Sequence, residues 1–284
     1  MKVRLLTCII TVFLILFSFK SYSQENPIEP GQQKRPILVG PVFGYNKSMH
    51  SVELLTFDDP TKLCKPFDNG GGNGFYAGLS FEYLFGDPAK SISSIIVRAL
   101  YNTMPAFMER IQDDYPTLVQ TGPNTNAVIQ TTTKHEANVT YSMFTVEACY
   151  KINPIPNVNL GITVGPTFDF PITKTINQTY KLVGDPLNAQ FYVDTALYIQ
   201  RGYKISADGR TITIQDGPIP NATGFRLGLK IGVQYEIIPG EKWFIVPAIY
   251  YNLGITKVTS AENWRINALQ LGVDIRYALK LFGS

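Results

Sequence analysis

Histidine, cysteine and recognisable catalytic motifs are scarce in this sequence. Its 284 residues include two histidines and three cysteines, and 17% of them are charged. Serine, histidine and aspartate form no arrangement with local motif support for nucleophilic catalysis. We therefore expect that the protein is not an enzyme and has no catalytic residue, cofactor or metal. The formal net charge of +3 argues neither for nor against an acidic partner, and we expect no nucleic-acid partner.

Long apolar runs are also missing, except at the N-terminus. Elsewhere no stretch is apolar over the length that a membrane-spanning helix needs, which excludes a helical membrane protein. At the N-terminus, a short positive region precedes an apolar segment over residues 5–17, and small residues follow at Ser21 and Ser23. This pattern predicts a secretory signal peptide, residues 1–23, cleaved before Gln24. An uncleaved N-terminal anchor is the alternative.

Apolar and polar residues alternate in the mature chain. In residues 225–237 every odd position is apolar or aromatic, and every even position is Arg, Gly, Lys, Gln or Glu. Because successive side chains of a β-strand point to opposite faces, such a strand has one apolar and one polar face. Residues 75–83, 158–166 and 269–279 repeat the pattern.

A water-soluble β-sandwich would alternate in the same way, with its apolar face inward. Three features favour a membrane barrel with the apolar face outward. The strands reach about ten residues, the length that a tilted strand needs to cross a bilayer. Their polar face carries both charges and glycines, as expected inside a narrow barrel. The chain also has 16 Tyr and 17 Phe, and aromatic residues flank the apolar face at the strand ends.

The alternation predicts an all-β fold: an eight-stranded antiparallel up-and-down transmembrane β-barrel over residues 36–284, after a periplasmic tail over residues 24–35. Short turns rich in Pro, Gly, Asp and Asn alternate with long connections over about 47–72, 104–136 and 171–221. Outer-membrane barrels have this layout, with the long loops outside the cell. The predicted strands are 36–46, 73–86, 92–103, 137–152, 157–170, 222–238, 242–255 and 264–281.

Three features carry a resemblance: the segment end Ser21-Tyr22-Ser23-Gln24, the eight alternating segments and the closing segment 269–277. Together they resemble the outer-membrane β-barrel domain family of the Bacteroidota, with proportions similar to PorT-like barrels, and also the eight-stranded OmpA-type barrel. The resemblance spans roughly residues 36–284. It implies a place in the bacterial cell outer membrane, contact with outer-membrane lipid, and envelope or secretion proteins as partners.

Nine charged side chains fall on the enclosed face of the predicted barrel. Five are positive and four are negative, so they can pair with one another. An eight-stranded barrel is just wide enough to be filled by side chains. We expect a salt-bridge network that fills the lumen; a narrow gated ion path or a binding cavity is the alternative. The nine are Glu82, Arg98, Glu147, Lys151, Arg226, Lys230, Glu236, Asp274 and Arg276.

Both histidines fall in predicted long loops. His50 shares the first loop with Asp58, Asp59 and the glycine-rich stretch 68–74, and His135 lies in the second. The acidic spacing fits no twelve-residue calcium loop, and the glycines open no helix as a nucleotide site requires. The two histidines could share a metal or a catalytic task, but nothing brings them together, so solvated loop residues are expected.

The connection 171–221 is the most distinctive loop. Residues 190–199 and 202–215 alternate like strands, and Asp208-Gly209 favours a tight hairpin turn. We expect a projecting β-hairpin that exposes aromatic and arginine side chains, the residue types that anchor interfaces. These side chains could instead pack on the hairpin or its neighbours, and the hairpin could raise the strand number to ten. The candidate partner-binding residues are Phe191, Tyr192, Tyr198, Arg201 and Tyr203.

Three functions stay open. The first is a structural or binding role at the cell surface, carried out by the long loops. The second is an accessory role in an envelope secretion or assembly machine, which the PorT-like resemblance implies. The third is an outer-membrane enzyme or a narrow pore; for the enzyme the sequence offers no converging nucleophile and base.

Overall fold

The computed structural model describes residues 37–54, 67–85, 92–122, 125–155, 158–184, 189–191, 202–240 and 242–279. They form twelve β-strands, and none of their segments is a helix long and apolar enough to cross a membrane. The expected signal peptide and tail lie outside the described residues. The strands are β1 (Ile37–Leu54), β2 (Phe67–Leu84), β3 (Ser93–Thr103), β4 (Ala106–Gly122), β5 (Thr125–Ile152), β6 (Leu160–Leu182), β7 (Gln190–Phe191), β8 (Lys204–Ile205), β9 (Thr211–Pro218), β10 (Arg226–Tyr235), β11 (Trp243–Gly254) and β12 (Trp264–Leu279).

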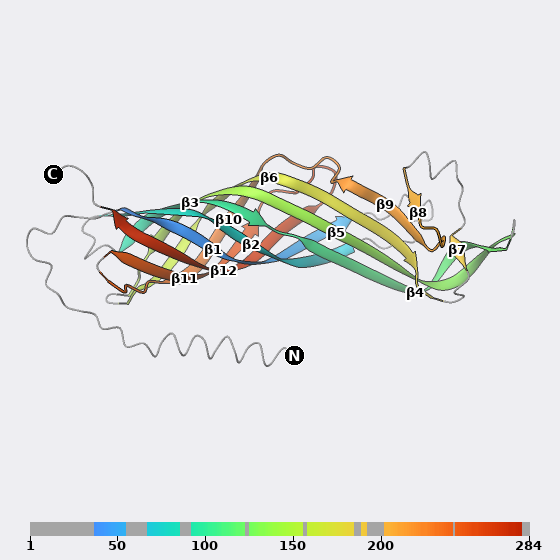
Figure 1. The fold of residues 1–284 in the computed structure, drawn as a ribbon, viewed down its shortest axis with the longest axis horizontal. Helices are drawn as coiled ribbons and strands as arrows, with labels where there is room; N and C mark the ends of the chain where they lie inside the picture. The colour runs from blue at the N-terminus through green and yellow to red at the C-terminus, as the bar shows by residue number, and fades with distance from the viewer. Residues whose placement is uncertain are drawn as a thin grey trace, which may run out of the picture. The chain divides into compact units, whose positions relative to one another are not determined.

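The strand pairings close on themselves. The series β5-β3-β2-β1-β12-β11-β10-β6 is paired throughout in antiparallel fashion, and β5 also pairs with β6, which joins its two ends. Figure 1 shows these strands lying side by side in a twisted bundle. We call this series the ring. A closed ring leaves no unpaired backbone edge over the paired lengths.

Part of the sheet continues beyond the ring. After a break at Met104 and Pro105, β4 continues β3 against β5 in the same register. β6 pairs with β10 along its first half and with β9 along its second. The order here is β7-β4-β5-β6-β9-β8, toward the right of Figure 1. We call residues 106–122, 125–139, 174–184, 189–191 and 202–219 the extension.

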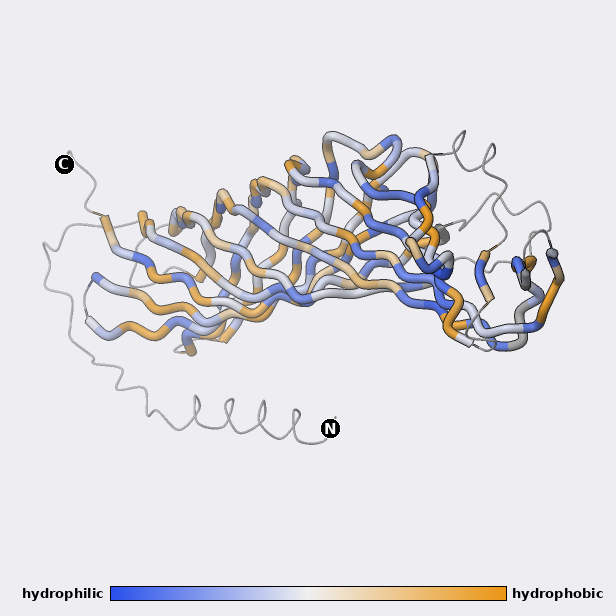
Figure 2. Tube along the Cα trace, turned by 45° about the vertical axis from the view of Figure 1, so that its right-hand side comes forward, coloured by the Kyte–Doolittle hydropathy of each residue, from blue (hydrophilic) through white to orange (hydrophobic). Residues whose placement is uncertain are grey.

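Side chains along the ring alternate between an exposed apolar face and a buried face that is largely polar. On β3 the exposed residues are Ile95, Val97, Ala99 and Tyr101, whereas Arg98 is among the buried ones. The Cα trace in Figure 2 accordingly changes between hydrophobic and hydrophilic colours along the strands. Apolar side chains therefore cover the outside of the ring, and charged and amide side chains lie within it.

The predicted strand positions agree with the structure better than the predicted loops do. Each of the eight predicted segments overlaps one strand of the ring. The expectation of long loops over 47–72, 104–136 and 171–221 is wrong for much of their length, because β1, β2, β5 and β6 run well into them and β4, β7, β8 and β9 lie within them. These stretches are rich in threonine, a β-branched residue that favours strands although it is polar.

Candidate functional site

All nine charged side chains expected on the enclosed face are buried within the ring. Eight of them form one continuous chain of ion pairs, and the sign of the charge changes at every link. Because every buried charge has an opposite neighbour, the attraction offsets the cost of removing the charges from water. The chain runs Glu236–Lys151–Glu82–Arg276–Asp274–Arg98–Glu147–Lys230.

Arg98 lies at a branch of this chain. Its Nη2 lies 3.1 Å from an Asp274 oxygen, and its Nη1 lies 3.4 Å from Glu147. The guanidinium also donates to the Tyr250 hydroxyl at 2.6 Å and lies 4.9 Å from the centroid of that ring. Five N–H donors in a fixed fork suit arginine to such a branch.

The ninth residue, Arg226, has a partner that the sequence analysis missed. Its Nη1 lies 3.9 Å from Asp169 on β6, and its guanidinium lies 5.6 Å from the Tyr141 ring centroid. Asp169 is buried and accepts a hydrogen bond of 2.8 Å from Thr145. Adding Asp169 to the four expected acids gives five negative charges against five positive ones. The alternation in 157–170 was sufficient to place it inward.

Glycines on the inner face make room for tyrosine rings. A Cβ built on Gly272 would lie 1.9 Å from the Tyr76 hydroxyl, and one built on Gly44 would lie 2.5 Å from the Tyr76 ring. Tyr250 lies against Gly232 in the same way, because a Cβ built on Gly232 would lie 2.2 Å from the nearest atom of the Tyr250 ring. The small residues on the polar face of β1, β10 and β12 are therefore part of the packing of the interior.

A layer of amides separates the charges from an apolar cap. Asn46 donates to Asn102 at 2.7 Å and accepts from Gln270 at 2.7 Å, and Asn102 donates to Thr145 at 3.1 Å. Beyond them lies the cap, a buried cluster around Trp264 to which β1, β2, β4, β5, β6 and β12 contribute. The interior of the described ring thus changes from charged to amide to apolar along its length.

His50 lies inside this cap, so the expectation of a solvated loop residue is wrong. It is buried on β1. The Trp264 indole donates to its Nδ1 at 3.1 Å, and its Nε2 lies 3.0 Å from the Met104 carbonyl. Because indole N–H can only donate, Nδ1 accepts and Nε2 carries the proton.

The extension has a hydrophobic core of its own. Val119, Tyr180, Leu182, Phe191 and Ile212 are buried together there. The Phe191 amide donates to the Gly209 carbonyl at 2.8 Å, so β7 connects the β4 side of the extension to the β8–β9 turn. A second core, separate from the cap, indicates a folded element rather than a set of loops.

Arg210, just before β9, connects the β8–β9 turn to the end of β6 and to the residue before β7. Its guanidinium donates to the carbonyls of Ala189 at 2.9 Å, Leu182 at 3.1 Å and Gly184 at 3.0 Å. It follows the tight turn expected at Asp208-Gly209, where Gly209 has a φ of +67°. The Asp208 carboxylate accepts hydrogen bonds from the Ser206 hydroxyl and the Arg210 amide. Both lower the pKa of Asp208, and the bond from Ser206 has the larger effect.

The outer face of the extension carries charges where the ring carries apolar side chains. Lys134 lies 2.8 Å from Glu109 and 2.8 Å from Glu136, and Lys181 pairs with Glu136. These four side chains cross β4, β5 and β6 and are partly exposed. The outer face of the extension therefore carries charged side chains together with exposed apolar ones such as Ile111 and Val128.

Two of the five candidate partner-binding residues are described, and neither is a fully exposed anchor. Phe191 is 4% exposed in the core of the extension, so the expectation that it projects into solvent is wrong. Tyr203 packs against the same core. The other three, Tyr192, Tyr198 and Arg201, lie outside the described residues. The alternative interpretation, that the aromatic side chains pack locally, describes Phe191 and Tyr203.

His135 is buried on β5 between the two apolar clusters, not in a solvated loop. Its ring centroid lies 4.1 Å from that of Tyr180 in the extension core and 5.9 Å from that of Phe67 in the cap. Burial, with a smaller effect of Arg110, lowers the pKa of His135 to about 4. No group of three or more His, Cys, Asp or Glu side chains that could hold a metal occurs among the described residues. His50 contacts Trp264, whereas His135 contacts Tyr180.

Comparison with known proteins yields loose structural matches and no family. No family model and no curated protein matches the sequence. Neisserial surface protein A matches at 13% identity over 86% of this chain and 97% of its own, with a TM-score of 0.35. The attachment invasion locus protein Ail of Yersinia pestis matches at 12% over 84% and 97%, with a TM-score of 0.32, and its complex with the heparin analogue sucrose octasulfate gives 0.31. The similarity is too loose to carry an argument about function.

Proposed function

We propose that this chain is a non-enzymatic outer-membrane protein: an eight-stranded transmembrane barrel that anchors a folded binding element at the cell surface. The observation that carries the proposal is the separation of the two faces of the ring. Large apolar side chains are exposed on its outside, among them Leu79, Leu229 and Ile231, while the charge chain is enclosed. Such an arrangement is unfavourable in water and favourable in lipid.

Outward aromatic side chains support a membrane band of the right height. These side chains fall into two groups at different heights along the ring, which we call levels. In the first, the ring centroids of Trp243 and Tyr277 lie 5.0 Å apart. The members of this level are Tyr83, Phe85, Tyr150, Trp243 and Tyr277. The other contains Phe75, Tyr101, Phe144, Phe170 and Phe225. On β2 the two levels are ten residues apart, from Phe75 to Phe85. At a strand tilt of about 40° that is about 25 Å, the height of the apolar band of such barrels.

The extension is then the part that meets partners. It lies beyond the second aromatic level, has its own core and carries a charged outer face. Binding residues are commonly displayed on elements that a rigid scaffold positions. We propose that its outer face and the adjoining segment 192–201 contact a protein or polymer outside the cell.

A pull-down with a trimmed variant tests this function. In the variant, Asn-Gly turns replace residues 110–135 and 179–214, joining the cross-strand pairs Glu109–Glu136 and Gln178–Gln215. We expect heat-modified gel migration, the sign of a folded barrel, to persist while a surface partner captured by the full chain is lost. A partner that the trimmed variant retains, or a secretion defect on deletion with envelope proteins in the pull-down, would favour the accessory role instead.

A further inference from the structure

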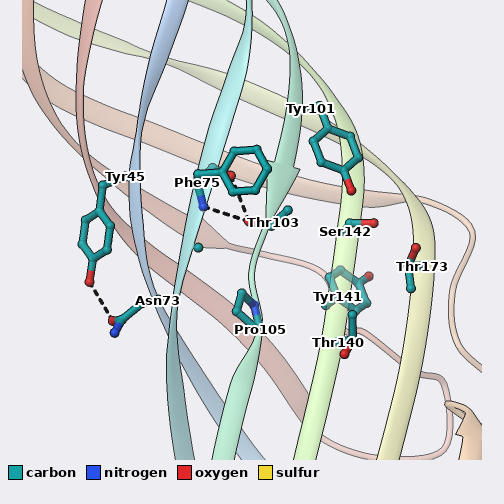
Figure 3. A pocket seen from close by; sticks show the side chains of 11 residues that line it. Tyr45, Asn73, Phe75, Tyr101, Thr103, Pro105, Thr140, Tyr141, Ser142 and Thr173 are labelled. Carbon is teal, nitrogen blue, oxygen red and sulfur yellow. Dashed lines mark hydrogen bonds between the residues drawn. The ribbon is translucent and has the colours of Figure 1, made fainter.

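A groove opens on the outward surface where β3 ends and β4 begins. β3 ends at Thr103, Pro105 interrupts the strand, and β4 begins at Ala106. The groove has a volume of about 540 Å³, and Figure 3 shows its side chains spread from Tyr45 on β1 to Thr173 on β6. Proline has no N–H to give to the neighbouring strand, so the interruption weakens pairing at this point of the wall.

The lining of the groove changes from aromatic to polar along the strands toward the extension. Toward the extension, the next outward residue after Phe75 on β2 is Asn73, and the next after Tyr101 on β3 is Thr103. The rings of Phe75 and Tyr101 lie 6.0 Å apart between centroids. Beyond them, Thr103, Thr140, Ser142 and Thr173 supply hydroxyl groups to the lining. The groove is therefore amphipathic along the strand direction.

The polar end offers a cation and hydrogen-bonding groups. Asn73 accepts hydrogen bonds from Tyr45 at 2.7 Å and from Lys47 at 3.1 Å through the same carbonyl oxygen. Lys47 is exposed beside the groove. Asn73 and Thr140 are exposed in the lining and supply an amide and a hydroxyl there.

We propose that this groove binds one phosphorylated glycolipid of the outer leaflet. The proposal rests on the membrane orientation given under Proposed function, which puts the aromatic part at the edge of the apolar band and the polar part among lipid headgroups. An acyl chain would pack on Phe75 and Tyr101, a phosphate would pair with Lys47, and sugar hydroxyls would meet Thr140 and Asn73. A lipid has this same apolar-to-anionic order, whereas a soluble ligand would leave the aromatic end unmatched.

Native mass spectrometry of the detergent-solubilised full chain tests the proposal, with diphosphorylated lipid A, dephosphorylated lipid A and phosphatidylglycerol as probes. Lys47→Glu removes the cation, and Thr140→Phe fills the groove from an exposed position. Their matched controls are Lys257→Glu, another exposed cation, and Asn138→Phe, two residues along the same face of β5. We expect one diphosphorylated lipid A per chain, and about tenfold less retention in both groove variants but not in the controls.

Three outcomes would overturn the site: no preference of the full chain for diphosphorylated lipid A over phosphatidylglycerol, equal loss in variants and controls, or full retention in the groove variants. Heat-modified gel migration of the same samples keeps this result separate from the proposed function. A folded, detergent-requiring barrel that retains no lipid A rejects the groove alone. A chain that stays monomeric in buffer without detergent rejects the membrane barrel as well.

Discussion

Arg276 is an internal link in the enclosed chain of charges. It pairs with Glu82 and with Asp274, and it is completely buried. Loss of Arg276 removes an ion pair from two carboxylates at once, Glu82 and Asp274, and leaves one completely buried negative charge in excess, which costs about 3–5 kcal/mol. Glu236, at the end of the chain and 9% exposed, contacts only Lys151 within it, and Lys151 keeps Glu82 when Glu236 is lost.

We therefore predict a graded loss of stability. Arg276→Ala lowers the free energy of unfolding by about 3–5 kcal/mol, and Glu236→Ala lowers it by less. Urea unfolding in lipid vesicles and heat-modified gel migration measure both effects. Arg265→Ala, an exposed arginine on the same strand, is the control and changes stability by less than about 1 kcal/mol. Equal stability of the Arg276 and Arg265 variants would show that the ion-pair chain does not stabilise the barrel.

The fit of Tyr76 against Gly272 gives a second prediction. Gly272→Ala would bring a methyl group into the Tyr76 hydroxyl and the Phe43 carbonyl, so the barrel must distort. Overpacking of this kind costs about 1–3 kcal/mol in the same unfolding measurement. Gly240→Ala is the matched control, because a Cβ at Gly240 meets nothing within 4 Å. A Gly272 variant as stable as the Gly240 variant would contradict the packing.

Among the elements, the extension depends on Arg210 for its closure. In Arg210→Met the side chain keeps its apolar stem but loses the three hydrogen bonds to Leu182, Gly184 and Ala189. We expect the Phe191 amide to exchange hydrogen about ten times faster, while the amides of β10 are unchanged. Lys204→Met, on the neighbouring β8, is the control. Unchanged exchange at Phe191 would mean that the core of the extension suffices without the arginine.

Acid should loosen the same element through His135. Its pKa is lowered from 6.5 to about 4 in the folded chain, so the folded state disfavours the protonated ring. The contribution to stability is intact above pH 6.5 and decreases as the pH falls toward 4, by about 3 kcal/mol at most. Hydrogen bonds from Lys134, and then from Lys181, lower the pKa of the neighbouring Glu136 carboxyl.

Hydrogen exchange of the extension at pH 7.5 and pH 4.5, corrected for intrinsic rates, measures this effect. We expect protection to fall at pH 4.5 in the parent chain and to fall much less in His135→Gln, whose side chain stays neutral. The same loss in both chains would assign the acid sensitivity to other groups.

Sequence alternation predicts the strands of the ring but not the extent of the extension. Residues 225–237 alternate cleanly because one face meets an apolar environment and the other an enclosed polar one. On the part of β5 that lies in the extension, the outward face over residues 130–138 is polar and the inward face includes threonine and histidine, as at Thr131, Thr133 and His135. Hydropathy therefore does not alternate along this part of β5, and its sequence resembles that of a polar loop.

The candidate site was predictable in part for the same reason. Inward charges such as Glu82 and Arg276 follow from position in an alternating strand, and Asp169 could have been found in that way. The burial of His50 depends on Trp264, 214 residues away. Such a contact comes from the closure of the ring and leaves no local signal in the sequence.

For the whole molecule, the layered interior predicts a barrel that does not conduct. Charged pairs, amides and the apolar cap around Trp264 follow one another along the described interior. Ions crossing the cap would lose their hydration without any compensating group. Purified protein in planar lipid bilayers should give no stable single-channel steps. Reproducible steps of constant size would support the narrow pore instead.

The direction of the outward side chains on β10 is the most direct test of the membrane orientation. Nitroxide labels placed singly at Leu229, Ile231 and Val233 of protein in lipid vesicles should be accessible to oxygen and shielded from a water-soluble nickel chelate. A label at Asp208 in the extension should show the reverse. Chelate access at the three β10 positions as high as at Asp208 would contradict the orientation on which the proposed function rests.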